Sequence, residues 1–369
     1  MLFHSSLRKE LARSFGATLV VLVTIVMTIM LIRTLGQASR GSVNPSEVML
    51  VMGFTVLGHL PTILTMSLFI SIVATLSRRY TDSEMVIWFS AGRGLTAFLS
   101  PLLRFAWPIL LGIGVLALGA WPWSNQQIQD LRDRYERRSD IDRVAPGQFQ
   151  ESGGGSRVFF IDKDTPDSKT GSNVFISTQD AGKETVTSAR SGRIETIKGD
   201  RFLMLNNGQR LETAEGQPDL KISEFETYGV LIGKDTPALQ ADTRPPRVLS
   251  TPELLRTPTP PNLGEFAWRI GLLLAAVNFV VIGLAVSSGN PRAGRSGNLL
   301  FALFAFIVYY NLLNVGQSWV ASGQVSLVRL LLTLHGMAFA LGLGWLLMRH
   351  NNISPRQLWR RRATSRSAA

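Results

Sequence analysis

The chain has 369 residues, of which 46% are hydrophobic and 17% charged, whereas soluble globular domains average about 25% charged. This balance excludes an ordinary soluble protein. The absence of cysteine excludes disulfides, thiolate metal sites and a cysteine nucleophile. The net charge of +12 is typical of nucleic-acid binders and of membrane proteins alike, so its position along the chain decides its meaning.

Six apolar segments are each long enough for the roughly 20 helical residues that cross a bilayer. They lie at residues 14–36, 53–77, 99–121, 266–288, 298–320 and 327–348. The run from Phe15 to Ile32 exceeds the roughly 7–15 apolar residues of a signal peptide, which favours a membrane anchor over a cleaved leader. We therefore predict six transmembrane helices, with one large domain inserted between the third and the fourth.

The basic residues are unevenly distributed around these segments. With the N-terminus inside, residues 1–13, 78–104, 289–297 and 349–369 are cytoplasmic. They hold 15 of the 38 basic residues and three of the 26 acidic ones, so they carry the whole excess of charge. Basic residues concentrate on the cytoplasmic side of membrane proteins. The charge therefore predicts a multi-pass protein with both termini in the cytoplasm, and no nucleic-acid partner is needed to explain it.

The cytoplasmic segment 78–98 contains a short amphipathic stretch. Thr81 and Glu84 match a capping box with Glu84 at the third helical position, which predicts a helix of about three turns, too short to span. Three apolar side chains are expected to face a soluble partner: Met85, Trp88 and Phe89. Two roles stay open for Glu84, a helix cap and a partner contact, and both can hold together.

Residues 124–265 differ in composition from the flanking segments. A charged stretch at 126–142, predicted to be helical, leads into short runs of β-branched and aromatic residues. The runs lie at 158–161, 174–178, 185–189, 193–197, 202–205, 210–213 and 222–232. Asn206-Asn207-Gly208 is typical of a hairpin turn. We predict a β sandwich or jelly roll outside the cytoplasm, followed by an extended linker at 236–261 that is rich in Pro and Thr.

The first of these runs offers two candidate interior faces. Phe159 and Ile161 lie on one face of the strand, with Val158 and Phe160 on the other. One pair is expected to line the interior of an incompletely closed jelly roll, where acyl chains can cross an aqueous compartment. The alternative is a closed sandwich that only supports the rest of the chain.

The sequence lacks the motifs of an enzyme or a pump. It contains no phosphate-binding loop, no His-Glu-x-x-His and no Gly-x-Ser-x-Gly. The predicted helix cores contain no acidic residue, and we expect His59 and His335 to be neutral hydrogen-bonding residues. We therefore predict a non-catalytic membrane subunit that binds no cofactor and no metal and takes its energy from a partner.

Arg33 and Arg40 lie on the outer side, against the preference for basic residues inside. Arg33 is either a base that reaches the outer interface or a phosphate contact, since arginine binds phosphate bidentately. We keep the two arginines as a candidate substrate-binding pair.

Short motifs follow one another along nearly the whole chain, each weak alone but specific in order and spacing. They are Ser67–Phe69, Tyr80–Glu84, Pro122–Ser124, Gly147–Gln150, Phe225–Tyr228, Ile232–Gly233, Trp268–Ile270 and Asn290–Arg295. In these motifs the chain resembles the LptF/LptG family of lipopolysaccharide export permeases, which are membrane subunits of an ABC transporter. Pro122–Ser124 and Gly147–Gln150 favour the first of these two paralogous branches.

The resemblance implies an inner-membrane permease subunit that extracts lipopolysaccharide and passes it through a periplasmic jelly roll. It also implies an LptG-like permease, an LptB-like ATPase dimer that binds ATP and Mg, and an LptC-like bitopic protein as partners. Glu84 would lie at the ATPase contact, and the first and fifth helices would flank the lipid cavity. The family's first helix often carries another base one turn before Arg33, whereas this chain has Met30 there.

Two alternatives stay open. A macrolide- or lipoprotein-type ABC permease has its outer domain between the first and second helices, whereas here it falls between the third and fourth. A non-transporting membrane scaffold needs neither six spans nor the apolar cytoplasmic segment. The expected organisation has helices at 1–123, the β domain at 124–265, helices at 266–348 and a basic cytoplasmic tail at 349–369.

Overall fold

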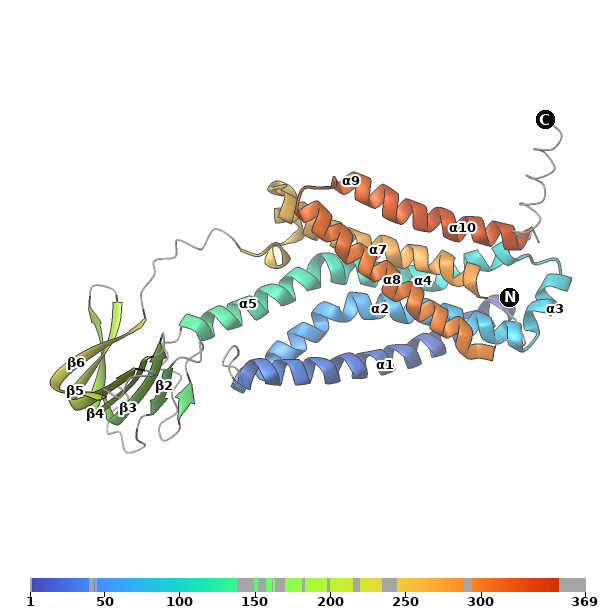
Figure 1. Ribbon diagram of the computed structural model, residues 1–369. Helices are drawn as coiled ribbons and strands as arrows, with labels where there is room; N and C mark the ends of the chain where they lie inside the picture. The colour runs from blue at the N-terminus through green and yellow to red at the C-terminus, as the bar shows by residue number, and fades with distance from the viewer. Residues whose placement is uncertain are drawn as a thin grey trace. The chain divides into compact units, whose positions relative to one another are not determined.

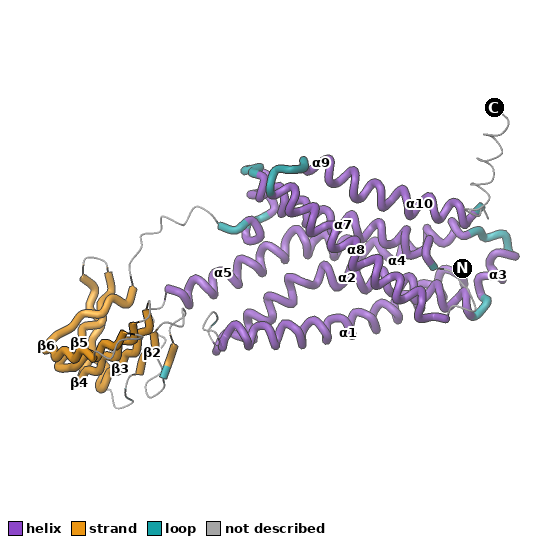
Figure 2. Tube along the Cα trace, in the orientation of Figure 1, coloured by secondary structure: helices purple, strands orange, loops and turns teal. Residues whose placement is uncertain are grey.

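The computed structural model describes most of the chain. The described residues are 2–39, 43, 45–137, 149–151, 157–160, 162, 170–180, 183–197, 200–214, 220–233, 244–287 and 294–351. Contacts divide the chain into two compact units. The first comprises residues 1–31, 52–128 and 244–369, and the second residues 32–51 and 129–243. Every described strand belongs to the second unit (Figure 2).

Among the described residues, six helical stretches are long and apolar enough to cross a membrane, which confirms the predicted spans. They are Ser6–Ser39, Val48–Thr81, Leu95–Arg134, Pro260–Val286, Gly297–Ala321 and Leu327–His350. Figure 1 labels their helices α1 (Leu2–Ser39), α2 (Val48–Thr81), α4 (Leu99–Val115), α5 (Trp121–Arg137), α7 (Pro260–Val286), α8 (Gly294–Ala321), α9 (Leu327–Leu330) and α10 (Met337–His350).

The third and sixth spans each contain a π-helical turn, at Leu116–Ala120 and Leu331–Gly336. The third span runs on through Pro122 into the charged residues of α5, so the predicted helical stalk is present as far as Arg137. The fourth span begins at Pro260, six residues before the predicted start, because proline is well suited to the first helical turn. The predicted helix cores contain no acid, but the longer α7 brings Glu265, one residue before the predicted core, into the helix.

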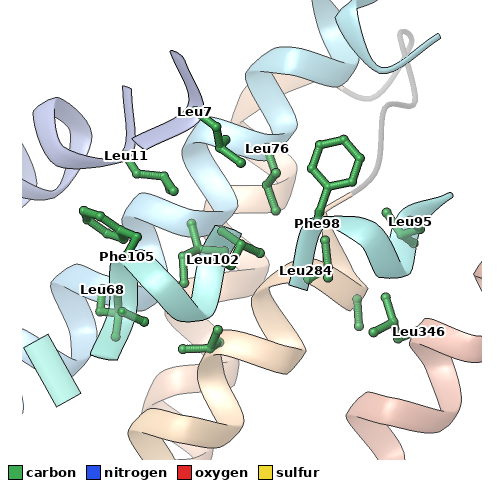
Figure 3. Packing of buried hydrophobic residues seen from close by; sticks show 14 of the residues in the cluster. Leu7, Leu11, Leu68, Leu76, Leu95, Phe98, Leu102, Phe105, Leu284 and Leu346 are labelled. Atoms are coloured by element: carbon green, nitrogen blue, oxygen red, sulfur yellow. The ribbon is translucent and has the colours of Figure 1, made fainter. Parts of the chain in front are cut away.

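A cluster of buried apolar side chains joins the helix ends near α3 (Glu84–Ser90). Figure 3 shows ten labelled members pointing toward one another: Leu7, Leu11, Leu68, Leu76, Leu95, Phe98, Leu102, Phe105, Leu284 and Leu346. They come from α1, α2, the turn Leu95–Phe98, α4, α7 and α10. The segment between α2 and α4 is therefore packed into the core of the first unit.

The helices differ sharply in how much of their surface is covered. In the most apolar 18-residue window, 67% of α7 is buried, whereas none of α1 is. The central α7 contacts α4, α8 and α10. Five branched residues of α1 are exposed: Val20, Val21, Ile25, Ile29 and Ile32. In a membrane protein such a surface contacts lipid or another subunit.

The described strands of the second unit form one antiparallel sheet in sequential order. They are β1 (Gln150–Glu151), β2 (Arg157–Phe160), β3 (Thr170–Asp180), β4 (Lys183–Ile197), β5 (Asp200–Ala214) and β6 (Leu220–Gly233). The predicted fold class, a helical membrane protein with an inserted all-β domain, is confirmed.

The hairpin predicted at Asn206-Asn207-Gly208 is wrong, because these residues lie inside β5. Asn207 has a φ of 53°, and Asn173 of β3 has a φ of 48°. Strand pairing skips a residue at both positions. Asparagine enters this backbone region more readily than most residues. The asparagines therefore mark a bend across the sheet instead of a turn between strands.

The bend gathers residues from both halves of the sheet into one buried cluster: Val174, Ile176, Ala189, Leu203 and Leu205. A Cβ on Gly192 would lie 3.1 Å from the side chain of Val174 and 3.2 Å from that of Leu203, so the two halves meet closely there. The runs predicted as separate strands at 185–189 and 193–197 are halves of β4. The described strands thus form one bent sheet that is not closed, instead of the two sheets expected of a sandwich.

Candidate functional site

The predicted capping box at the start of α3 is wrong. Ser83 precedes the helix in the left-handed conformation, with a φ of 61°, and makes no side-chain cap. The Thr81 hydroxyl donates to the carbonyl of Ser77 at 3.0 Å. Glu84 is thus the first helical residue, and its carboxylate lies 3.2 Å from Nη1 of Arg79. The charge of Glu84 serves a contact between elements instead of a cap.

Arg79 connects α3 to α1. Its side chain is 3% exposed, and its Nη2 lies 2.9 Å from Oε2 of Glu10. The Arg79 Nε donates to the same oxygen at 3.0 Å, and Nη2 donates to the Ser6 hydroxyl at 3.3 Å. A planar guanidinium can hold two carboxylates in fixed positions. The contacts Glu10–Arg79–Glu84, which we call the Arg79 relay, join the first turns of α1 to α3.

The apolar face of α3 is rotated relative to the prediction. Met85 is 1% exposed and belongs to the core cluster, and Trp88 is half-buried against it. Because the core takes these two side chains, they do not form an outward face. Val86, Ile87 and Phe89 are 65%, 66% and 41% exposed. Of the three apolar residues expected to face a partner, Phe89 alone is exposed.

Arg349 ties three helix ends together beside the Arg79 relay. Its Nη1 donates to the carbonyls of Ala285 and Ser287, both at 2.7 Å, at the C-terminal end of α7. Its Nη2 donates to the Tyr80 hydroxyl at 3.2 Å. The last carbonyls of a helix lack partners within the helix, so a guanidinium there stabilises the end. This contact fixes the end of α2 from which α3 starts.

A second buried polar network surrounds the start of α7. Arg269 is fully buried, and its Nε lies 3.0 Å from Oε1 of Glu265, which is 5% exposed. The same oxygen accepts from the Trp121 indole at 2.8 Å, and Oε2 accepts from Gln317 at 3.3 Å. Glu265 therefore links α7 to α5 and α8.

The guanidinium of Arg269 binds the segment that leads from the β domain into α7. It donates to the Thr251 hydroxyl at 2.9 Å and to the carbonyls of Leu249, Arg247 and Pro246 at 3.0, 3.3 and 3.4 Å. The following helix, α6 (Thr251–Arg256), begins with a capping box of Ser250 and Glu253. Hydrogen bonds from Ser250 hold the pKa of the Glu253 carboxyl below its usual value. Sequence analysis missed this network, although an acid and a base four residues apart in an apolar helix are a signal for it.

His335 makes the interhelical hydrogen bond expected of a membrane histidine. Its Nδ1 lies 2.8 Å from the Tyr309 hydroxyl, which also accepts from Asn278 at 2.7 Å. Asn278 further donates to the carbonyl of His335 at 3.0 Å. These contacts join α7, α8 and the π-helical turn of the last span.

The candidate substrate-binding pair is not assembled among the described residues. Arg33 is exposed near the C-terminal end of α1, whereas Arg40 lies outside the described residues. A phosphate contact by the two arginines stays a prediction.

A hollow of about 500 Å³ lies against the bent sheet, and Phe149, Phe160 and Phe175 line it. The rings of Phe149 and Phe160 are 4.7 Å apart. Val158, predicted to share a face with Phe160, is half-buried. The backbone of Phe159 pairs with Ile176, but its side chain and the whole of Ile161 lie outside the described residues. Phe160 is thus the predicted interior residue that lines a hollow.

The described structure defines a polytopic membrane protein with a β domain inserted after the third span and a short helix joined to its first helix by ion pairs. Residues 6–349 match the family model for the lipopolysaccharide export system permease LptF/LptG, and the chain belongs to this family. It is 27% identical over 312 residues to lipopolysaccharide export system permease protein LptF of Escherichia coli K12, covering 84% of this chain and 85% of that protein. The LptF protein of Shigella flexneri matches equally well. The family match favours the export permease over the two alternatives.

Proposed function

We propose that this chain is a non-catalytic permease subunit that extracts lipopolysaccharide from the bacterial inner membrane. The family match over residues 6–349 carries the proposal, because it covers the spans on both sides of the β domain. The related proteins are named as lipopolysaccharide export permeases. The proposed partners are an LptG-like permease, an LptB-like ATPase dimer that binds ATP and Mg, and an LptC-like bitopic protein.

The Arg79 relay supports a route from ATP hydrolysis to lipid. The proposed ATPase docks on the exposed apolar residues of α3, and Glu84 passes its displacement through Arg79 to Glu10. The first helix then moves as a unit, because α1 is continuous from Leu2 to Ser39. Its exposed apolar surface flanks the lipid, and Arg33 near its far end contacts the phosphates.

Depletion of the chain from its host tests this function. Newly made lipopolysaccharide is expected to stay in the inner-membrane fraction, because its proposed extraction requires this subunit. Pulse-labelling followed by density-gradient separation of the two membranes measures this, and re-expression of the chain is the control. Labelled lipopolysaccharide that reaches the outer membrane at the normal rate in depleted cells contradicts the proposal.

The proposed topology has both termini in the cytoplasm and the β domain in the periplasm. In this cysteine-free chain, Thr227→Cys on β6 is expected to react with a membrane-impermeant maleimide in cells with a permeabilised outer membrane. Ser83→Cys is expected to react only after lysis, since the basic segments lie inside. Both positions are exposed, so a difference in labelling reports the side of the membrane and not burial within the protein. The reverse pattern refutes this orientation.

The proposed lipid path includes the hollow of the β domain. A photo-crosslinking residue at Phe160 is expected to trap lipopolysaccharide only while ATP is hydrolysed, because the hollow is lined by aromatic rings. Ile222 is a matched control, since it is 58% exposed and lies outside the hollow. Crosslinks from Phe160 to protein alone make the domain a support instead of a conduit.

A further inference from the structure

A cavity of about 330 Å³ lies where the first turns of α1 meet the last turns of α2 and the start of α8. Glu10, Arg13, Ser14 and Ala17 of α1 line one wall. Their spacing places all four on one face of the helix. Leu299 of α8 also lines the cavity. The cavity is at the other end of α1 from Arg33.

The lining is rich in hydrogen-bond donors. Thr75 of α2 is 2% exposed, and its hydroxyl has no hydrogen-bond partner within the described part of the chain. Arg13 and Arg78 line the same cavity and are exposed. Arg13 makes no ion pair with any other described residue. A buried hydroxyl beside two guanidinium groups is suited to a ligand with several acceptor oxygens.

The one acid of this lining is already engaged. Glu10 Oε2 lies 2.9 Å from Arg79, and Oε1 lies 3.8 Å from Arg78. Among the residues that line the cavity, an ammonium group on the ligand therefore finds no carboxylate that is not already paired with an arginine. The site favours an anionic headgroup over a zwitterionic one that carries an amine.

The lining also includes the apolar residues Ala17, Ala74 and Leu299, and an apolar strip continues from it along α1. Ala17 and Leu299 border the polar groups, and Val20 and Val21 follow on α1 at 66% and 57% exposure. Polar donors next to an apolar strip match the headgroup and the acyl chains of a lipid. A free phosphate ion would use only the polar part.

We infer that this cavity binds the phosphodiester headgroup of an anionic glycerophospholipid. Arg13 and Arg78 hold the phosphate oxygens, and the Thr75 hydroxyl donates to the same group. The bound lipid bridges α1 and α2 beside the Arg79 relay and limits the movement of α1. The lipid class and the site both differ from those of the exported substrate.

Native mass spectrometry of the full-length chain, purified with its accompanying subunits and delipidated in mild detergent, tests the inference. The probes are 1-palmitoyl-2-oleoyl-phosphatidylglycerol, the matching phosphatidylethanolamine, and inorganic phosphate. Phosphatidylglycerol is expected to bind about tenfold more tightly than the other two, because only it offers an anionic diester with acyl chains.

The variant Arg13→Gln/Arg78→Gln is expected to lower phosphatidylglycerol affinity about tenfold, and Thr75→Val about threefold. Arg93→Gln/Arg104→Gln removes the same charge from exposed positions outside the cavity and is expected to change affinity less than about twofold. Equal losses in both double variants would show general charge attraction and overturn the site. Equal binding of the two lipids overturns the headgroup assignment, and inorganic phosphate that binds as tightly overturns the lipid assignment.

Discussion

Replacing Arg79 with methionine is expected to leave the chain in the membrane but to lower the lipid exported per ATP hydrolysed about tenfold. Methionine keeps an unbranched apolar stem in the buried position and removes the group that bridges Glu10 and Glu84. The two carboxylates then lose their shared partner, so displacement of α3 no longer reaches α1. A factor of ten corresponds to about 1.4 kcal/mol of coupling free energy.

The measurement compares ATP hydrolysis with lipopolysaccharide release from reconstituted proteoliposomes. Arg79→Lys is expected to be intermediate, because an ammonium is a point charge and cannot hold two carboxylates in a planar fork. Arg104→Met is the matched control, because Arg104 is exposed and its replacement removes the same charge. Glu84→Gln is expected to reduce the ratio as well, because it removes one end of the relay. An unchanged ratio in Arg79→Met at normal complex levels refutes the relay.

The spans were predictable because the bilayer sets their length and the apolar runs reach it. The start of α7 was not predictable from hydropathy, because the helix begins at Pro260 and Pro261, several residues before the apolar segment. That difference hid Glu265 from a search for acids within the spans. Hydropathy therefore located the apolar part of α7 but not its polar first turns, which contain Glu265.

Contacts between distant residues were beyond sequence reasoning. Arg79 and Glu10 are 69 residues apart, and nothing local distinguishes Arg79 from Arg78, which is 59% exposed. The glycines of the last span show the same limit. In the structure a Cβ on Gly342 would lie 3.0 Å from Ile282 of α7, whereas nothing lies within 4 Å of one on Gly344. Periodicity shows that a face exists but not which neighbour it meets.

The β domain shows the same limit at a finer scale. The runs of β-branched and aromatic residues located the strands. The sequence Asn206-Asn207-Gly208, however, is compatible both with a turn between two strands and with a bend inside one strand. The bend is preferred here because the residues on both sides continue to pair with β4 and β6. The local sequence allows Asn207 to adopt the left-handed conformation, but the pairing of the long strands determines that this produces a bend and not a turn.

Replacing Arg269 with methionine is expected to destabilise the first unit by about 3–5 kcal/mol, because removing one partner of a buried ion pair leaves the other charge uncompensated. The carboxylate of Glu265 would stay 5% exposed, with Trp121 and Gln317 as its other partners. The thermal midpoint of the full-length chain in detergent is expected to fall by roughly 5 °C or more. Arg256→Met, at an exposed position, is the control for loss of charge.

The same variant is expected to loosen the segment that enters α7 from the β domain. Arg269 holds three carbonyls of that segment, including the one of Arg247, whose side chain is exposed. Trypsin is therefore expected to cut after Arg247 at least about tenfold faster in Arg269→Met, since local opening controls proteolysis. Glu265→Gln leaves Arg269 able to bind these carbonyls, so it should lower the thermal midpoint while cleavage stays slow. Equal cleavage rates in Arg269→Met and the unsubstituted chain would show that other contacts hold the segment and that Arg269 only neutralises Glu265.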